Sequence, residues 1–274
     1  MTEHAGPSPG RPPSVASSDY FVDPAWGSEQ ERLHALEAWG DPHTIRHLEH
    51  LGVAPGWTCL EAGAGAGSIA RWLAGRVAPS GRVVAADIDT RFLAGLEVPG
   101  LEIRTFDLRA EEFPPATFDL IHARLLLMHL PDRLSVMKRL AQWLRPGGWL
   151  LVEEADDYAT QTTSRAALRR WWRAVAGLGA FDLRCGRALP GEVASLGLDD
   201  VDAAAAVMMV RGATPAARFV QYSMAMARDP IIAERGWSAR QYDRLMADLD
   251  DPAFLEPGLA TVSVWGRRPS GASS

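Results

Sequence analysis

The sequence predicts an α/β fold: a Rossmann-like sheet of seven mostly parallel strands with helices on both faces, added N-terminal helices, and a helical insertion before the last strand. Short apolar runs alternate with stretches of helical periodicity, which is the pattern of right-handed βαβ units. The chain has 274 residues, of which 47% are apolar and 23% charged, an ordinary composition for a globular protein. These observations predict one domain over residues 19–274 and exclude a collagenous or disulfide-scaffold protein.

The N-terminal part divides into a tail and two expected helices. Residues 1–18 contain four prolines among Ser and Gly and are predicted to form a disordered tail, because they offer little apolar surface to bury. Residues 28–52 hold the two helices, the first over 28–39 and the second over 43–51. Gly52 ends the second helix.

The central region, residues 56–155, shows the clearest alternation. The expected strands are 58–61, 82–87, 101–106, 118–123 and 149–153. The expected helices are 68–77, 90–96 and 131–144. The helical segments 157–182 and 213–257 are additions to this core, and the remaining expected strands lie over 201–210 and 259–266. Within and between these additions, helices are expected over 164–178, 187–196, 215–227 and 239–249.

A glycine-rich turn follows the first expected strand. Glu61 precedes Gly63, Gly65 and Gly67, and the helix over 68–77 begins directly after them. Glycine lets the backbone turn tightly and lets a ligand approach closely, and the free N–H groups at the helix start favour a negative ligand group. A plain strand-to-helix turn is the alternative interpretation.

An acid ends the next expected strand. Asp87 comes 20 residues after Gly67, where a carboxylate can bind the hydroxyls of a ribose. The alternative is an N-cap role for the helix expected near Thr90. Asp89 fits that capping role better, which leaves Asp87 free.

Four stretches together resemble the motifs of a known family. They are Cys59–Gly67, Val83–Asp89, Phe118–Arg124 and Leu144–Gly148. They are similar to those of class I S-adenosylmethionine (SAM) dependent methyltransferases of the small-molecule type. The Leu-Arg-Pro-Gly-Gly run before a strand is typical of that family and not of dehydrogenases. The resemblance covers mainly residues 45–155.

The resemblance implies a SAM site at the glycine-rich turn and the strand ends. The implied contacts are Glu61 beside the SAM amino group, Gly63 and Gly65 along the methionine moiety with Ala64 between them, Asp87 at the ribose, Ile88 on the adenine, Asp107 at the adenine amino group with Leu108 beside it, and the backbone of Ala123. SAM carries a sulfonium and a zwitterionic tail, so an acidic site suits it. A nicotinamide oxidoreductase is disfavoured because the third glycine comes one residue too early for the spacing that binds a pyrophosphate.

Methyl transfer from a sulfonium is an in-line displacement, and a base is needed only if the acceptor must lose a proton. His129 is the expected catalytic base; packing beneath the helix that begins near Pro131 is the alternative. His122 lies inside a strand and is expected to be structural. The acidic run over 153–157 either accepts a proton or attracts a cationic amine, or it is a solvated loop.

No metal is expected at this site. A magnesium-dependent catechol-type site uses acids after the fourth strand and an Asp-Asn pair after the fifth. Here Ala123, Arg124 and Leu125 follow the fourth strand, and the chain contains no asparagine.

Several aromatic and basic residues have two open interpretations. Trp171 and Trp172 either line an aromatic acceptor pocket or pack the added helices. Arg32 either meets the SAM carboxylate or lies on a solvated helix face. Tyr20 and Trp26 are candidates to close over SAM.

The connection between the last two strands is far longer than the two to five residues of a hairpin. We therefore expect the insertion over 213–257 to form a lid that supplies part of the acceptor pocket. Dimerisation or packing on the sheet is the alternative.

The predicted function is SAM-dependent methyl transfer to an O or N atom of a small molecule, in bacterial secondary metabolism and without a metal. The alternative is a protein of the same fold that binds SAM without transferring methyl. The net charge of −6 and the lack of a basic block argue against a nucleic-acid partner, and no apolar run is long enough to cross a membrane. A cytoplasmic location and a homodimer complete the expectations.

Overall fold

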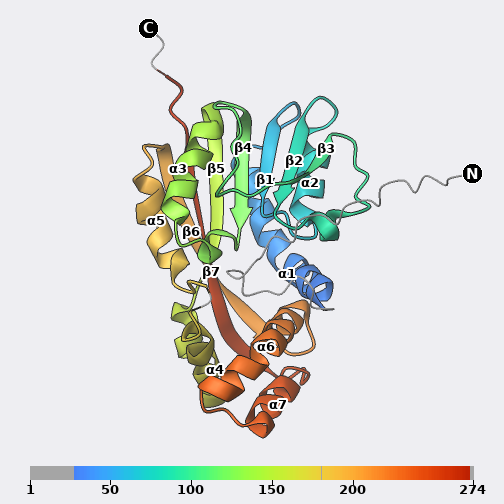
Figure 1. Cartoon of the computed structure of the whole chain (residues 1–274), viewed down its shortest axis with the longest axis vertical. Helices are drawn as coiled ribbons and strands as arrows, with labels where there is room; N and C mark the ends of the chain where they lie inside the picture. Colours follow the sequence, from blue (N-terminus) through green and yellow to red (C-terminus); the bar gives the residue numbers. More distant parts are fainter. Residues whose placement is uncertain (1–27, 180, 272–274) are drawn as a thin grey trace, which may run out of the picture.

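The computed structural model describes residues 28–179 and 181–271, so the tail predicted over 1–18 lies outside the described residues, as do Tyr20 and Trp26. Seven strands form one sheet in the order β3-β2-β1-β4-β5-β7-β6, and β7 is antiparallel to both of its neighbours (Figure 1). The strands are β1 (Thr58–Ala62), β2 (Arg82–Asp87), β3 (Leu101–Thr105), β4 (Phe118–Arg124), β5 (Leu144–Asp156), β6 (Asp199–Arg211) and β7 (Leu255–Arg267). The predicted fold class is confirmed. No helix among the described residues is long and apolar enough to span a membrane.

The helices follow the predicted order, with three short 3₁₀ segments between them. The α-helices are α1 (Glu29–His50), α2 (Ser68–Val77), α3 (Arg133–Trp143), α4 (Ala166–Ala176), α5 (Cys185–Ala194), α6 (Pro215–Glu234) and α7 (Ala239–Asp248). The 3₁₀ segments are η1 (Thr90–Leu93), η2 (Leu127–His129) and η3 (Tyr158–Thr162).

The side-chain alternation along the strands builds a core on each face of the sheet. In β1, Cys59 packs with α1 and α2 on one face, while Leu60 packs with α3 and α5 on the other. Leu120 and Ile121 divide in the same way in β4. Successive side chains of a strand point to opposite faces. A strand that helices cover on both faces therefore has a continuously apolar sequence.

The N-terminal region forms one helix, so the prediction of two helices was wrong. α1 continues through Gly40 and Pro42, although proline lacks the N–H that would bond one turn back. Tertiary contacts hold the helix at this point. Arg124 donates hydrogen bonds to Asp41 and to Thr44, 2.9 Å each, and this anchors α1 to β4 immediately around the proline.

The prediction of a helix over 90–96 was also wrong, because only the single turn η1 forms. Asp89 caps this turn by accepting from the N–H of Arg91, as the sequence indicated. Gly95, with φ of +87°, then turns the chain away before a second helical turn can form.

The insertion before β7 folds as α6 and α7. Together with α4 they gather beyond one end of the sheet, below it in Figure 1, where α1 begins. α6 packs against α1 and α4, and α7 packs on α6. This arrangement places α6 between the sheet end and α7.

Candidate functional site

A cavity of about 470 Å³ lies at the carboxyl ends of the parallel strands, which is where open α/β sheets bind ligands. Its floor is the glycine-rich turn between β1 and α2. Gly63 and Gly65 have φ of +72° and +55°, values that favour glycine, so the turn needs these residues. Glu37 of α1 accepts from the N–H of Ser68 and fixes α1 against this turn.

The cavity brings together nearly all of the predicted cofactor residues. The lining includes Glu61, Gly63, Ala64, Gly65, Asp87, Ile88, Asp107 and Leu108. Ala123, also predicted from the resemblance, is fully buried and is not among the lining residues. The roles of all these residues toward a ligand stay predictions.

Asp87 is held tightly by backbone donors. Its carboxylate accepts from the N–H of Gly65 at 2.9 Å and from that of Asp89 at 3.0 Å. The sequence suggested that the Asp87 carboxylate has no backbone partner. In the structure it has two, and it connects the end of β2 to the glycine-rich turn. Burial raises its pKa, and the two backbone donors act in the opposite direction.

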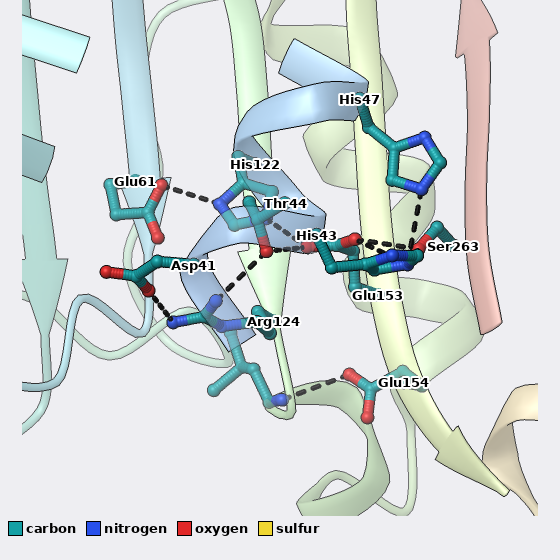
Figure 2. Close-up of polar contacts among 11 residues, drawn as sticks. Asp41, His43, Thr44, His47, Glu61, His122, Arg124, Glu153, Glu154 and Ser263 are labelled. Carbon is teal, nitrogen blue, oxygen red and sulfur yellow. Dashed lines mark hydrogen bonds and ion pairs between the residues drawn. The ribbon is translucent and has the colours of Figure 1, made fainter. Parts of the chain in front are cut away.

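A buried chain of charged groups begins at Glu61, which lines the cavity, and crosses neighbouring strands of the sheet (Figure 2). Glu61 of β1 pairs in register with His122 of β4, and both point to the face that α1 covers. His122 lies 2.7 Å from Glu61 through Nδ1 and 3.2 Å from Glu153 through Nε2. Thr44 and Ser263 donate to the two oxygens of Glu153, so every atom of this buried carboxylate is satisfied.

The charges in this chain stabilise one another. Burial alone would lower the pKa of His122, but the charges and hydrogen bonds of Glu61 and Glu153 together raise it to about 9. Burial opposes ionisation of Glu153 as well, and the hydrogen bond and charge of His122 lower its pKa to about 2. His122 is thus an imidazolium between two carboxylates. The expectation that it is structural fits this position.

His43 and His47 extend the chain along α1. Their Nε2 atoms lie 3.2 Å apart, and both stand within 4.8 Å of a Glu153 oxygen, a spacing compatible with a metal ion. However, the Arg46 guanidinium donates to Nδ1 of His43, which leaves the proton on Nε2, facing Ser263 at 3.1 Å. This geometry suits a hydrogen-bonded cluster better than a cation site.

The four acids over 153–157 are buried, so the interpretation of this run as a solvated loop was wrong. None of these acids lines the cavity, although Ala155 between them does. Glu154 is fully buried and accepts from three consecutive N–H groups, those of residues 126–128. Asp156 and Asp157 both bind Arg187 at 2.6 Å. These acids fix the loop after β4 and the start of α5, and thereby shape the site from behind.

His129 lies in η2 and lines the cavity, where its side chain is half-buried. Burial, and to a lesser extent the positive charge of Arg32, lower its pKa to about 4. Its imidazole is therefore neutral near pH 7. Its ring lies 5.7 Å from that of Phe181, at a tilt of 60°.

The C-terminal helices supply part of the wall. Trp171 and Trp172 of α4 are buried, and both line the cavity. Phe219 and Met226 of α6 line it as well. α7 contributes no lining residue; its Tyr242 packs in the core behind α6. The insertion thus reaches the cavity through one of its two helices.

Arg32 lies on the cavity wall and not on a solvated helix face. Its guanidinium binds both oxygens of Glu29, at 2.7 and 2.8 Å, and both residues are buried. The sequence offered no sign of this pairing beyond the three-residue spacing.

Comparison with known proteins agrees with this geometry. The family described as "Methyltransferase domain" matches residues 28–202, from α1 into β6. "Methyltransferase str3" of Strobilurus tenacellus is 38% identical over 145 residues, 52% of this chain and 50% of that protein. "Methyltransferase GfsG" of Streptomyces halstedii is 34% identical over 155 residues, 52% of this chain and 53% of that protein. The chain thus spans about half the length of these two curated relatives.

A solved structure shares the fold. Phosphoethanolamine N-methyltransferase 2 of Haemonchus contortus, in complex with phosphomonomethylethanolamine and S-adenosylhomocysteine, matches with a TM-score of 0.59 and 17% identity. The match covers 88% of this chain and 57% of that one.

Proposed function

This chain belongs to the methyltransferase domain family, and on that premise we propose that it transfers a methyl group from SAM to an oxygen or nitrogen atom of a small molecule. The observation that carries the proposal is the cavity wall. It combines the glycine-rich turn with the carboxylates of Glu61, Asp87 and Asp107 at the ends of three neighbouring strands.

The chemistry of this wall fits SAM. Carboxylates suit the ammonium group, the ribose hydroxyls and the adenine amino group, and none of these contacts requires a phosphate site. The side chain of Ile88 is 52% exposed, which leaves apolar surface to pack on a flat base. The S-adenosylhomocysteine bound by the Haemonchus contortus protein supports the same class of ligand here.

When bound, SAM supplies a methyl group on a sulfonium centre. The residues of this chain position the acceptor in line, exclude water, and receive the acceptor's proton. We assign that last task to His129, because it is a neutral imidazole in the wall. A hydroxyl becomes strongly acidic as its oxygen gains a methyl group, so even a base with a pKa of about 4 can accept the proton.

Transfer of a labelled methyl group from SAM to a panel of small alcohols, phenols and amines tests the proposal. In the active reaction, His129→Gln should lower kcat by roughly 10²- to 10⁴-fold and leave SAM affinity unchanged. His34→Gln, an exposed histidine on α1, is the matched control. SAM binding without label transfer to any acceptor would favour the alternative, a non-methylating protein.

We also propose that the reaction needs no metal. The residues that line the cavity include no cluster of metal-ligand spacing among the described residues; the nearest such group, His43, His47 and Glu153, lies behind the wall. Turnover in excess chelator should equal turnover without it. A loss that magnesium restores would contradict this expectation.

A further inference from the structure

The cavity has two halves of different chemistry. The carboxylates stand at the ends of β1, β2 and β3, on one side of the sheet. The other half follows β4 and β5, and α1 and α6 enclose it. We call it the acceptor half. Its main residues are Met128, Trp172, Val175, Phe181, Phe219 and Met226.

The acceptor half presents apolar surface almost throughout. Among the described residues after β4 that line it, His129 and Ser223 carry the polar side chains other than the two indoles. The imidazole is neutral, and the Ser223 hydroxyl already donates to the carbonyl of Phe219 at 2.8 Å. An ion placed against this wall would lose its hydration without gaining a counter-charge.

Two ion pairs of the described residues stand beside this half, and each is closed on itself. Arg124, which lines the cavity at the end of β4, pairs with Asp41 at 2.9 Å. The Arg32 guanidinium binds both oxygens of Glu29, and its carbon lies 5.7 Å from the centre of the Phe219 ring. Because Glu29 compensates its charge, Arg32 adds no net charge for an acidic acceptor.

We infer that the acceptor is an uncharged, largely apolar alcohol or phenol, whose body lies between α4 and α6. This inference rests on the proposed function. The acceptor oxygen bonds to the methyl carbon while the carbon–sulfur bond breaks, its electron pair remains on sulfur, and the hydroxyl proton passes to His129. An aliphatic amine is disfavoured because it enters as a cation, and a phosphorylated acceptor because it enters as an anion.

Calorimetry on the protein saturated with S-adenosylhomocysteine tests this inference with three probes of one shape: 1-naphthol, 1-naphthyl phosphate and 1-naphthylmethylammonium. We expect 1-naphthol to bind at least tenfold more tightly than either ion. Met226→Arg should weaken 1-naphthol binding and strengthen binding of the phosphate. Met209→Arg, at an exposed position of β6 outside the cavity, is the matched control and should change neither.

Either ion binding as tightly as 1-naphthol, or no binding of 1-naphthol, would overturn the inference. These outcomes are separate from failure of the proposed function. If S-adenosylhomocysteine itself does not bind, the proposed function fails, and the same three probes measured without it still report the polarity of the acceptor half.

Discussion

At the scale of single residues, Asp87 connects the ligand cavity to the backbone. Replacing it with Ala removes a carboxylate that accepts from Gly65 and Asp89 and faces the proposed ribose position. We expect the affinity for S-adenosylhomocysteine to fall by about 1.5–3 kcal/mol, roughly 10- to 150-fold, measured by calorimetry. The control is Asp119→Ala, which removes a carboxylate that accepts from Thr58 and Arg145 outside the cavity. Equal affinity in the two variants would contradict the ribose role.

His122 links protein stability to pH. Its pKa is raised to about 9 in the folded state from 6.5, so its stabilising contribution is complete below about pH 6.5 and is lost as the pH rises through 9. We expect the free energy of unfolding to fall over that range by roughly 3 kcal/mol, measured by denaturant titration. His122→Gln keeps a hydrogen-bonding side chain but cannot carry the charge, so its stability should lack this slope. A slope of equal size in both proteins would show that other groups cause it.

At the scale of elements, Gly212 joins β6 to the insertion. A Cβ at this position would overlap the backbone carbonyl oxygen of Asp251, in the connection between α7 and β7. Gly212→Ala must therefore move backbone, and we expect it to lower the free energy of unfolding by about 3 kcal/mol or more.

Gly197 provides the comparison for that substitution. It has φ of +71°, but a Cβ at this position would have no neighbouring atom within 4 Å, so Gly197→Ala meets only backbone strain of about 1–2 kcal/mol. The denaturant midpoint of Gly212→Ala should therefore be lower than that of Gly197→Ala. Similar losses would mean that the join between β6 and α6 can shift without disturbing the fold.

At the scale of the whole molecule, the last strand in the sequence is an interior strand of the sheet. β7 lies between β5 and β6 and is buried along most of its length. Removal of residues 252–274 would leave two unpaired strand edges and an open core, so we expect no cooperative unfolding transition in that protein. Removal of residues 269–274 alone, beyond the strand, should preserve the transition. A cooperative transition in the longer deletion would contradict this view of β7.

The assembly state belongs to the same scale. The homodimer expected from the sequence stays a proposal, which sedimentation analysis of the purified protein can test. The division of residues 19–274 into one domain is likewise a proposal that the single cooperative transition would support.

The sequence alone determined the sheet, its order of elements and the position of the ligand cavity. The alternation of apolar side chains and the glycines of the turn are local patterns in the sequence. They can be recognised without knowing how distant parts of the chain pack. The resemblance then placed eight of the nine cofactor residues on the cavity wall, all except Ala123. Local signals could not decide whether α1 breaks at Pro42, because contacts of Arg124 from a distant strand hold that helix together.

Only the tertiary structure decided which polar groups meet. Glu61, His122 and Glu153 are far apart in sequence and lie on three different strands. Strand register and the cover of α1 bring them together. The acids over 153–157 looked solvated because their partners come from other elements. The apolar half of the cavity depends on the approach of α4 and α6, which no local pattern specifies, because burial is set by what packs against a residue.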